Sequence, residues 1–254
     1  MDVNTGDNSG TRFQNMAYAG GVVADGTVVS PSVPLQFWFC RNPGLALPLI
    51  ALQYHEVKVI VNWGAAARGM TPSAEQLWVD YIYLDTDERR RFAQQSHEYL
   101  IEQVQHQQSS DQNVELNFNH PVKELIWTGG ITENTGVRAA LQGTNYLIKL
   151  NGHDRFAARP LKYFCSTQVW QHHSGTPVGG ATEGVGQATV DQIAVYSFAL
   201  KPEEHQPSGT CNFSRIDTAR LEASDTATNN MNVYAVNYNV LRIMSGMGGL
   251  AYSN

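Results

Sequence analysis

The sequence predicts an all-β protein, an antiparallel sandwich or barrel whose strands are joined by long loops. Short apolar runs recur at near-regular spacing along the 254 residues, with turn-forming residues between them, which is typical of this class. One run, residues 114–119, alternates apolar and polar side chains and should have one buried and one solvated face. Hydrophobic residues make up 42% of the chain and charged residues 16%, so we expect a large core and no gross disorder.

Eight segments are expected as strands because each is apolar or alternates at the period of a β-strand. They are residues 49–63, 77–84, 114–118, 124–128, 146–150, 161–169, 192–200 and 232–243. The last of these is apolar on both faces and should be covered on both sides. The glycine-rich apolar tail that follows, residues 245–252, would be costly to expose, so it should contact either this domain or a neighbouring subunit.

One segment, about residues 85–105, predicts a short surface helix instead. Asp85 and Glu88 have the spacing of a capping box, and an apolar stripe runs along one side from Phe92 to Val104. Three consecutive arginines within the segment point around a helix rather than to one side. We therefore expect the arginines to face solvent, with a subunit contact as the next alternative.

Composition and motifs argue against nucleic-acid binding and catalysis. A formal net charge of −6 supplies no basic surface for a nucleic-acid backbone. The chain has no GxSxG, HExxH, Walker or GxGxxG pattern. His172 and His173 lack the spacing of a zinc site and are expected in an exposed loop, and residues 153–154 and 203–205 lie in loops without an obvious nucleophile. We predict no enzyme activity, no cofactor and no metal site.

Nothing in the sequence indicates membrane insertion or secretion. No run approaches the roughly 18 apolar residues of a membrane helix, and the N-terminus has no basic-then-apolar signal segment. The three cysteines, Cys40, Cys165 and Cys211, are widely spaced and form no CxxC motif. This usage fits a reducing compartment and three ordinary, partly buried side chains.

Two stretches combine apolar runs and turns in a distinctive order. Residues 196–221 hold an apolar strand, a turn-rich loop that begins at residue 201, and a second extended run. Its distinctive residues are Pro202, His205, Pro207, Cys211, Asn212, Phe213, Ser214, Arg215, Ile216 and Asp217, with Phe213 and Ile216 as apolar anchors. Residues 34–59 form the other stretch, with Phe37, Trp38, Phe39, Asn42, Gly44, Tyr54, His55 and Glu56.

These two stretches, together with residues 120–129 and 232–254, resemble the major capsid proteins of the nucleocytoplasmic large DNA viruses, the double jelly-roll family. The resemblance implies an antiparallel eight-stranded jelly-roll sandwich, in which the residues above are a structural and assembly signature. It also implies a homotrimer that forms a pseudo-hexagonal capsomer, with neighbouring capsomers and minor capsid proteins as partners. Such a protein would tile an icosahedral shell, reside in the virion and assemble in the host cytoplasm.

The resemblance also suggests a domain division, because members of this family are longer and begin with another jelly roll. We interpret residues 1–35 as a tail or linker that is the remnant of that jelly roll, and residues 36–254 as the C-terminal jelly-roll domain. The alternative is a non-viral carbohydrate-binding or cupin-like protein, since fold does not determine function. Five tryptophans and eleven tyrosines could stack on sugars, although most lie in strand-like runs, and the histidine-rich metal motif of a cupin is not evident.

Overall fold

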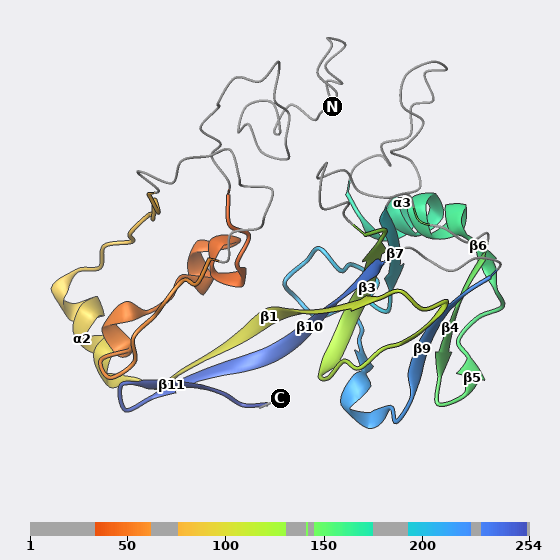
Figure 1. The fold of residues 1–254 in the computed structure, drawn as a ribbon. Coiled ribbons are helices and arrows are strands. Elements are labelled where there is room, and N and C mark those ends of the chain that lie inside the picture. Colours follow the sequence, from red (N-terminus) through yellow and green to blue (C-terminus); the bar gives the residue numbers. More distant parts are fainter. Residues whose placement is uncertain are drawn as a thin grey trace, which may run out of the picture.

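Two antiparallel sheets stacked as a sandwich form the body of the protein (Figure 1). The computed structural model describes residues 34–61, 76–130, 141, 145–174, 193–224 and 230–252. Within these residues the predicted all-β antiparallel sandwich is confirmed. No helix in this part of the chain is long and apolar enough to cross a membrane.

The larger sheet has the strand order β1-β10-β3-β7, and the smaller has the order β2-β9-β4-β5. The larger sheet consists of β1 (His97–Ser109), β10 (Met231–Met244), β3 (Pro121–Thr128) and β7 (Ile193–Ser197), with β8 (Cys211–Asn212) beside β3 and β11 (Met247–Leu250) beside β10. The smaller consists of β2 (Asn113–Glu115), β9 (Ala219–Ala223), β4 (Asn145–Leu150) and β5 (His153–Asp154), with β6 (Arg159–Pro160) beside β4.

The core lies between the two sheets and is built around three aromatic side chains. Trp127 of β3, Tyr146 of β4 and Phe164 are each 0% exposed. The ring centroid of Trp127 lies 5.1 Å from that of Phe164 and 5.7 Å from that of Tyr146. Completely buried aliphatic side chains from both sheets surround them: Val114, Val122, Leu125, Ile148, Leu221 and Val233.

Four of the expected strands largely coincide with observed strands. A fifth begins with an observed strand and has the predicted alternation of buried and exposed side chains. Residues 124–128, 146–150 and 232–243 lie within β3, β4 and β10, and residues 193–197 form β7. β10 is buried along most of its length, as its two apolar faces predicted. Residues 114–118 begin with β2, and their side chains alternate between buried apolar and exposed polar as predicted.

The strand predictions for residues 49–63 and 77–84 are wrong over their described parts. Residues 49–51 form the 3-10 helix η3 (Leu49–Ala51), and the other described residues of both segments have no regular structure. Trp78 and Tyr83 are 85% and 91% exposed. No strand in the described part of the chain pairs with either segment. An apolar pattern becomes a strand only where a neighbouring strand supplies the hydrogen bonds.

The strand prediction for residues 161–169 is also wrong, because this segment is helical. A π-helical turn, η5 (Tyr163–Thr167), leads into the short helix α3 (Gln168–His172). Tyr163 and Gln168 are five positions apart, and Gln168 Nε2 donates to Tyr163 Oη at 2.9 Å. The helical turns bury Phe164 and Cys165 against the core, which a flat strand here would place on opposite faces.

The predicted helix begins as expected and ends early. α2 (Thr86–Gln94) starts with the predicted capping box: the Glu88 N–H donates to Asp85 Oδ1 at 2.8 Å, and the Asp85 N–H donates to Glu88 Oε2 at 3.3 Å. The chain then leaves the helix, and β1 occupies the rest of the predicted segment. β1 pairs with β10 at all thirteen of its positions, so tertiary pairing outweighs the local helical pattern.

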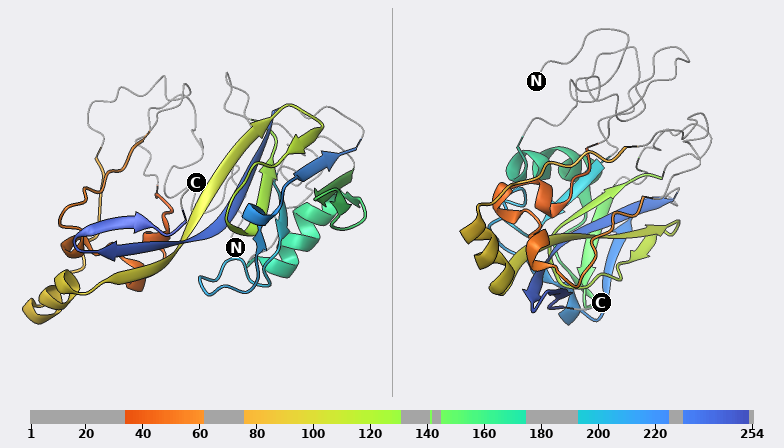
Figure 2. Two further views of the ribbon diagram at one scale, coloured as in Figure 1. Left: turned by 90° about the horizontal axis from the view of Figure 1, so that it is seen from below. Right: turned by 90° about the vertical axis from the view of Figure 1, so that its left-hand side faces the viewer.

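β1, β10 and β11 extend well beyond the sandwich, as Figure 2 shows in its left view. We call this extension the arm; it comprises residues 97–103 and 237–250, α2, and residues 37–54. A two-residue turn at Ser245 and Gly246, with φ values of 52° and 80°, joins β10 to β11. The Tyr54 N–H donates to the Gly246 carbonyl at 2.9 Å, which attaches the N-terminal segment to the tip.

Replacement of Trp127 by alanine should destabilise the protein by about 3–5 kcal/mol, because it leaves a cavity at the centre of the aromatic core. Trp170, which is 75% exposed, is the matched control, and its replacement by alanine should change the free energy of unfolding by at most about 0.5 kcal/mol. Urea denaturation of both variants measures the difference. Similar losses for the two would contradict the position of the core.

Candidate functional site

The N-terminal signature residues lie on the arm. Phe37 and Phe39 stack with their ring centroids 5.0 Å apart, and Trp38 contacts Phe39 edge-on at 5.3 Å. The Trp38 ring also lies 6.4 Å from that of Tyr99 on β1. Trp38 and Phe39 lie in η1 (Trp38–Cys40), and Phe37 directly precedes it. The aromatic cluster places η1 beside β1.

The remaining residues of this group form turns and exposed chain. Asn42 Oδ1 accepts a hydrogen bond from the Gly44 N–H at 2.9 Å and so caps η2 (Pro43–Leu45). Tyr54, His55 and Glu56 are exposed, with 79% of Tyr54 accessible to solvent. Their side chains are therefore available for contact with another molecule.

The C-terminal signature residues lie at the edge of the sandwich, beside β3. β8 pairs with β3, and Phe213 is buried between Phe118 and Phe198 at centroid distances of 6.3 and 5.9 Å. Ser214 Oγ accepts a hydrogen bond from the His120 N–H at 2.9 Å. Pro202 is buried, Cys211, Ile216 and His205 are half-buried, and Pro207, Asn212, Arg215 and Asp217 are exposed.

The prediction that residues 211–217 are extended is wrong after Asn212. The chain there forms the 3-10 helix η6 (Phe213–Arg215), which Asn212 caps by accepting the Ser214 N–H at 3.1 Å. Arg215 and Asp217 therefore do not share one face of a strand. The turn allows Phe213 to enter the core while its neighbours remain at the surface.

A chain of ion pairs connects the arm to the sandwich on the face of the larger sheet that points away from the core. Arg41, from the N-terminal stretch, pairs with Oε2 of Glu102 on β1. Oε1 of the same carboxylate lies 2.7 Å from Nζ of Lys123 on β3. The Lys123 side chain is 1% exposed and that of Glu102 is 6% exposed, so this pair is shielded from solvent.

A β-bulge explains why two successive charged residues of β3 lie on this face. The register between β10 and β3 shifts so that Val236 faces Glu124 and Asn237 faces Val122, which leaves Lys123 without a ladder partner on β10. Such an extra residue redirects side chains. The free carbonyl of Lys123 accepts the N–H groups of residues 198 and 199, at 2.9 and 3.2 Å. It thereby holds the chain just before residues 201–209, which we call the signature loop.

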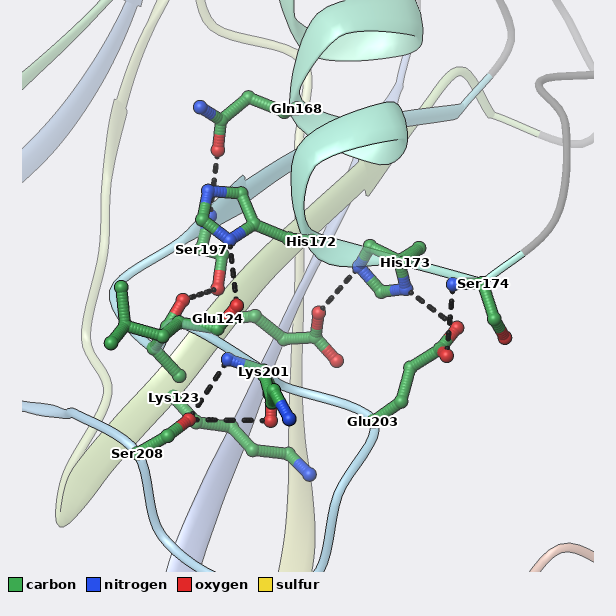
Figure 3. A network of polar contacts seen from close by, with 12 residues as sticks. Lys123, Glu124, Gln168, His172, His173, Ser174, Ser197, Lys201, Glu203 and Ser208 are labelled. Carbon is green, nitrogen blue, oxygen red and sulfur yellow. Dashed lines mark hydrogen bonds and ion pairs between the residues drawn. The ribbon is translucent and has the colours of Figure 1, made fainter.

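The second charged residue of the bulge, Glu124, contacts a histidine that follows α3 (Figure 3). Glu124 Oε2 lies 3.0 Å from Nε2 of His173, and Nδ1 of the same ring lies 3.2 Å from Oε1 of Glu203 in the signature loop. The contact with Glu124 is the largest cause that raises the pKa of His173 above its ordinary value, and Glu203 adds to it against the opposing effect of burial.

Tyr238 of β10 lies between these two groups of charges. Its ring is 5.5 Å from Nζ of Lys123, a cation–π contact. Burial, together with the negative charges of Glu102 and Glu124, raises the pKa of the Tyr238 hydroxyl to about 12. The phenol therefore remains neutral near neutral pH and separates two buried carboxylates.

The geometry supports a structural role for these charges. Among the described residues no group of three or more histidine, cysteine, aspartate or glutamate side chains could hold a metal ion. Cys40 is exposed, Cys211 is half-buried and Cys165 is buried. The ion pairs join the arm, β1, β3, α3 and the signature loop, which is what a rigid building block requires.

Sequence reasoning missed most of this network. It did not single out Glu102, Lys123, Glu124 or Tyr238. It also expected His172 and His173 in an exposed loop, which is wrong, because both are half-buried at the end of α3. One feature of the sequence could have indicated it: a lysine and a glutamate are adjacent inside an apolar strand. If two successive charged residues are both buried, the strand needs a bulge and each charge needs a partner.

The tip of the arm presents apolar side chains to solvent. The predicted contact of the C-terminal tail with this domain is present, because β11 pairs with β10. Its larger side chains nevertheless remain accessible: Met244, Met247, Leu250 and Tyr252 are 52%, 59%, 46% and 56% exposed. Several large apolar side chains exposed on one projecting hairpin are typical of a protein–protein contact.

Glu102→Gln should destabilise the protein by about 3–5 kcal/mol, because it leaves the buried ammonium of Lys123 without its counter-charge. The matched control is Glu98→Gln on the same strand, whose pair with Arg242 at 2.7 Å is exposed and should contribute less than about 1 kcal/mol. Urea denaturation at neutral pH compares the two. Equal losses of stability in the two variants would show that the buried pair contributes no more than the exposed one.

Comparison with known proteins identifies the family. The family model for the large eukaryotic DNA virus major capsid protein matches residues 88–249, and a model of the major capsid protein N-terminus matches residues 26–85. The chain is 53% identical, over 94% of its length, to the major capsid protein of Pyramimonas orientalis virus. It is 42% identical, over 87% of its length, to that of Paramecium bursaria Chlorella virus 1.

The relatives are longer than this chain, which spans 66% of the length of each of these two proteins. The alignment with the major capsid protein of Phaeocystis pouchetii virus, which is 38% identical, runs over 349 residues, more than the 254 of the chain. The relatives therefore have residues within the aligned span that this chain lacks.

A solved structure shows the same fold. The quasi-atomic model of the PBCV-1 virus capsid matches with a TM-score of 0.68 and 37% sequence identity, over 92% of this chain and 74% of that one. The predicted jelly-roll sandwich is thereby confirmed. On these matches to its sequence and its fold, the chain belongs to the family of major capsid proteins of large eukaryotic DNA viruses.

Proposed function

We propose that this chain is a structural capsid subunit that trimerises into pseudo-hexagonal capsomers, which tile the icosahedral shell of a large DNA virus. The observation that carries the proposal is the 53% identity to a major capsid protein over 94% of the chain. Neighbouring capsomers and minor capsid proteins are the proposed partners. The virion is the proposed location, after assembly in the host cytoplasm.

The surface of the protein supports an assembly role. Stable interfaces between proteins bury apolar side chains at their centre and polar ones at the rim. The arm carries both, with Met247 and Leu250 exposed at its tip and the charged residues of α2 beside it. A projecting arm can reach a neighbouring subunit while the sandwich remains unchanged.

The carbohydrate-binding or cupin-like alternative gains no support from the structure. Trp127 and Tyr146, two of the aromatic residues that could have stacked on sugars, are buried in the core. The family match and the similarity to a capsid structure favour the structural role instead.

The domain division at residue 35 stays a prediction. The two family models meet between residues 85 and 88, which favours a later division and assigns residues 36–85 to the N-terminal part of the family. The exposed apolar residues of segments 55–61 and 76–84 agree with that assignment, because both segments lack strand partners among the described residues.

The assembly proposal predicts a molar mass near three times 28.1 kDa, or a larger closed particle. Light scattering during size-exclusion chromatography, at low micromolar concentration and with a reducing agent, measures it. A monomer at every concentration tested would contradict trimer formation by this chain.

If the arm tip is a subunit contact, Leu250→Asp should reduce the trimer fraction by about tenfold or more, because it places a charge in an apolar interface. Leu200→Asp is the control, since Leu200 is 73% exposed and lies beside the signature loop, away from the arm. The same light-scattering measurement applies. An unchanged mass for Leu250→Asp would exclude the arm tip as a contact.

A further inference from the structure

Two different sets of contacts hold the signature loop, residues 201–209: one closes its base and the other attaches it to the sandwich. At its base, the Lys201 N–H donates to Ser208 Oγ at 2.9 Å and the Leu200 N–H donates to the Ser208 carbonyl at 3.4 Å. Nearer its tip, Glu203 contacts the residues that follow α3. The base is held by neutral hydrogen bonds, whereas the tip is held through ionisable groups.

The residues after α3 form the other half of this second attachment. The His173 N–H donates to the Val169 carbonyl at 2.9 Å, which fixes the histidine at the end of the helix. The Ser174 N–H donates to Glu203 Oε2 at 2.9 Å. His172 Nδ1 lies 3.1 Å from the Leu200 carbonyl. Figure 3 shows His173 between the carboxylates of Glu124 and Glu203.

The two carboxylates approach opposite nitrogens of one imidazole ring, at 3.0 Å for Glu124 and 3.2 Å for Glu203. A neutral imidazole has one N–H, so one of its nitrogens would present a lone pair to a negatively charged oxygen. A protonated ring has an N–H at both nitrogens, so it presents positive charge to both carboxylates: it hydrogen-bonds Glu203 and lies at ion-pair distance from Glu124. The Glu124 side chain is only 8% exposed, so water replaces a lost partner poorly.

We propose that His173 is a pH-operated latch, whose protonated ring holds the loop of residues 201–209 against β3 and whose loss of a proton releases the loop. Among the described residues no lysine or arginine pairs with Glu124 or Glu203, and His172 beside the latch contacts the Leu200 carbonyl instead of either carboxylate. Lys123 on β3 pairs with Glu102, and Lys201 in the loop pairs with Glu204 at 2.9 Å. Tyr238 on β10 stays neutral in this range, as its raised pKa of about 12 shows.

The sign of the pH dependence follows from both partners. The pKa of His173 is raised above 6.5, so the latch stabilises the fold fully below pH 6.5 and is lost as pH rises through the raised value. Burial would raise the pKa of Glu203, but hydrogen bonds from Ser174 and His173 outweigh it and lower the pKa below 4.5. The latch is therefore fully closed between about pH 4.5 and pH 6.5, and it opens as pH rises through the raised pKa of His173 or falls through the lowered pKa of Glu203.

The latch goes beyond the proposed capsid function, because its contacts all lie within one chain. Hydrogen–deuterium exchange of the full chain, read by mass spectrometry on a peptide that covers the loop, tests it. At pH 6 this peptide should exchange about tenfold faster in His173→Gln than in the unmodified protein, because the variant lacks the charge-assisted contact. At pH 9 the two proteins should exchange equally. Comparison at the same pH removes the chemical dependence of exchange on pH.

Two further variants keep the test decisive if His173→Gln does not fold. Glu203→Gln removes the more exposed partner and should abolish most of the pH-dependent protection. Glu204→Gln is its matched control, because Glu204 is the next residue and its carboxylate pairs with the exposed Lys201 at 2.9 Å. A rate ratio that is the same at pH 6 and pH 9, or equal effects of the Glu203 and Glu204 variants, would overturn the latch. Light scattering on the same samples reports trimer formation separately.

Discussion

The pairing of β10 with β1 is the interaction on which the rest of the structure depends. β10 contacts β1 at thirteen positions on one side, and β3 and then β11 on the other. The backbone hydrogen bonds of this long strand therefore support both the sandwich and the arm. Its buried inner face contributes Met231, Val233 and Ala235 to the core, and its outer face places Tyr238 among the buried charges. One strand thus connects packing, electrostatics and the candidate assembly surface.

Local sequence predicted the elements whose pattern agrees with their tertiary surroundings. β3, β4, β7 and β10 were found because an apolar run coincides with burial, and the capping box at Asp85 located the start of α2. The end of α2 could not be found in this way, because β1 has polar residues at a spacing that suits a helix and becomes a strand only through β10. Residues 161–169 failed for the opposite reason: Phe164 enters the core from a helical turn, which an apolar run does not distinguish from a strand.

The candidate site was less predictable than the fold, since its residues come from distant parts of the chain. The family resemblance singled out the signature stretches, but it did not indicate that Arg41 reaches Glu102 or that Glu203 reaches His173. The pairs of Lys123 with Glu102 and of Glu124 with His173 depend on the bulge at Lys123, whose position is set by the register between β3 and β10. Register follows from the whole sheet, so no single motif contains it. Buried charges inside an apolar strand are the residues to examine in a sequence of this kind.

The apolar segments 55–61 and 76–84 show why assembly matters physically to this protein. Ile60, Trp78 and Tyr83 are each more than 80% exposed, and open strand-like chain of this type pairs readily with other chains. Both segments lack strand partners among the described residues, so their apolar side chains lie open there. Under the proposed function, contact with neighbouring subunits would then stabilise the individual chain as well as the shell.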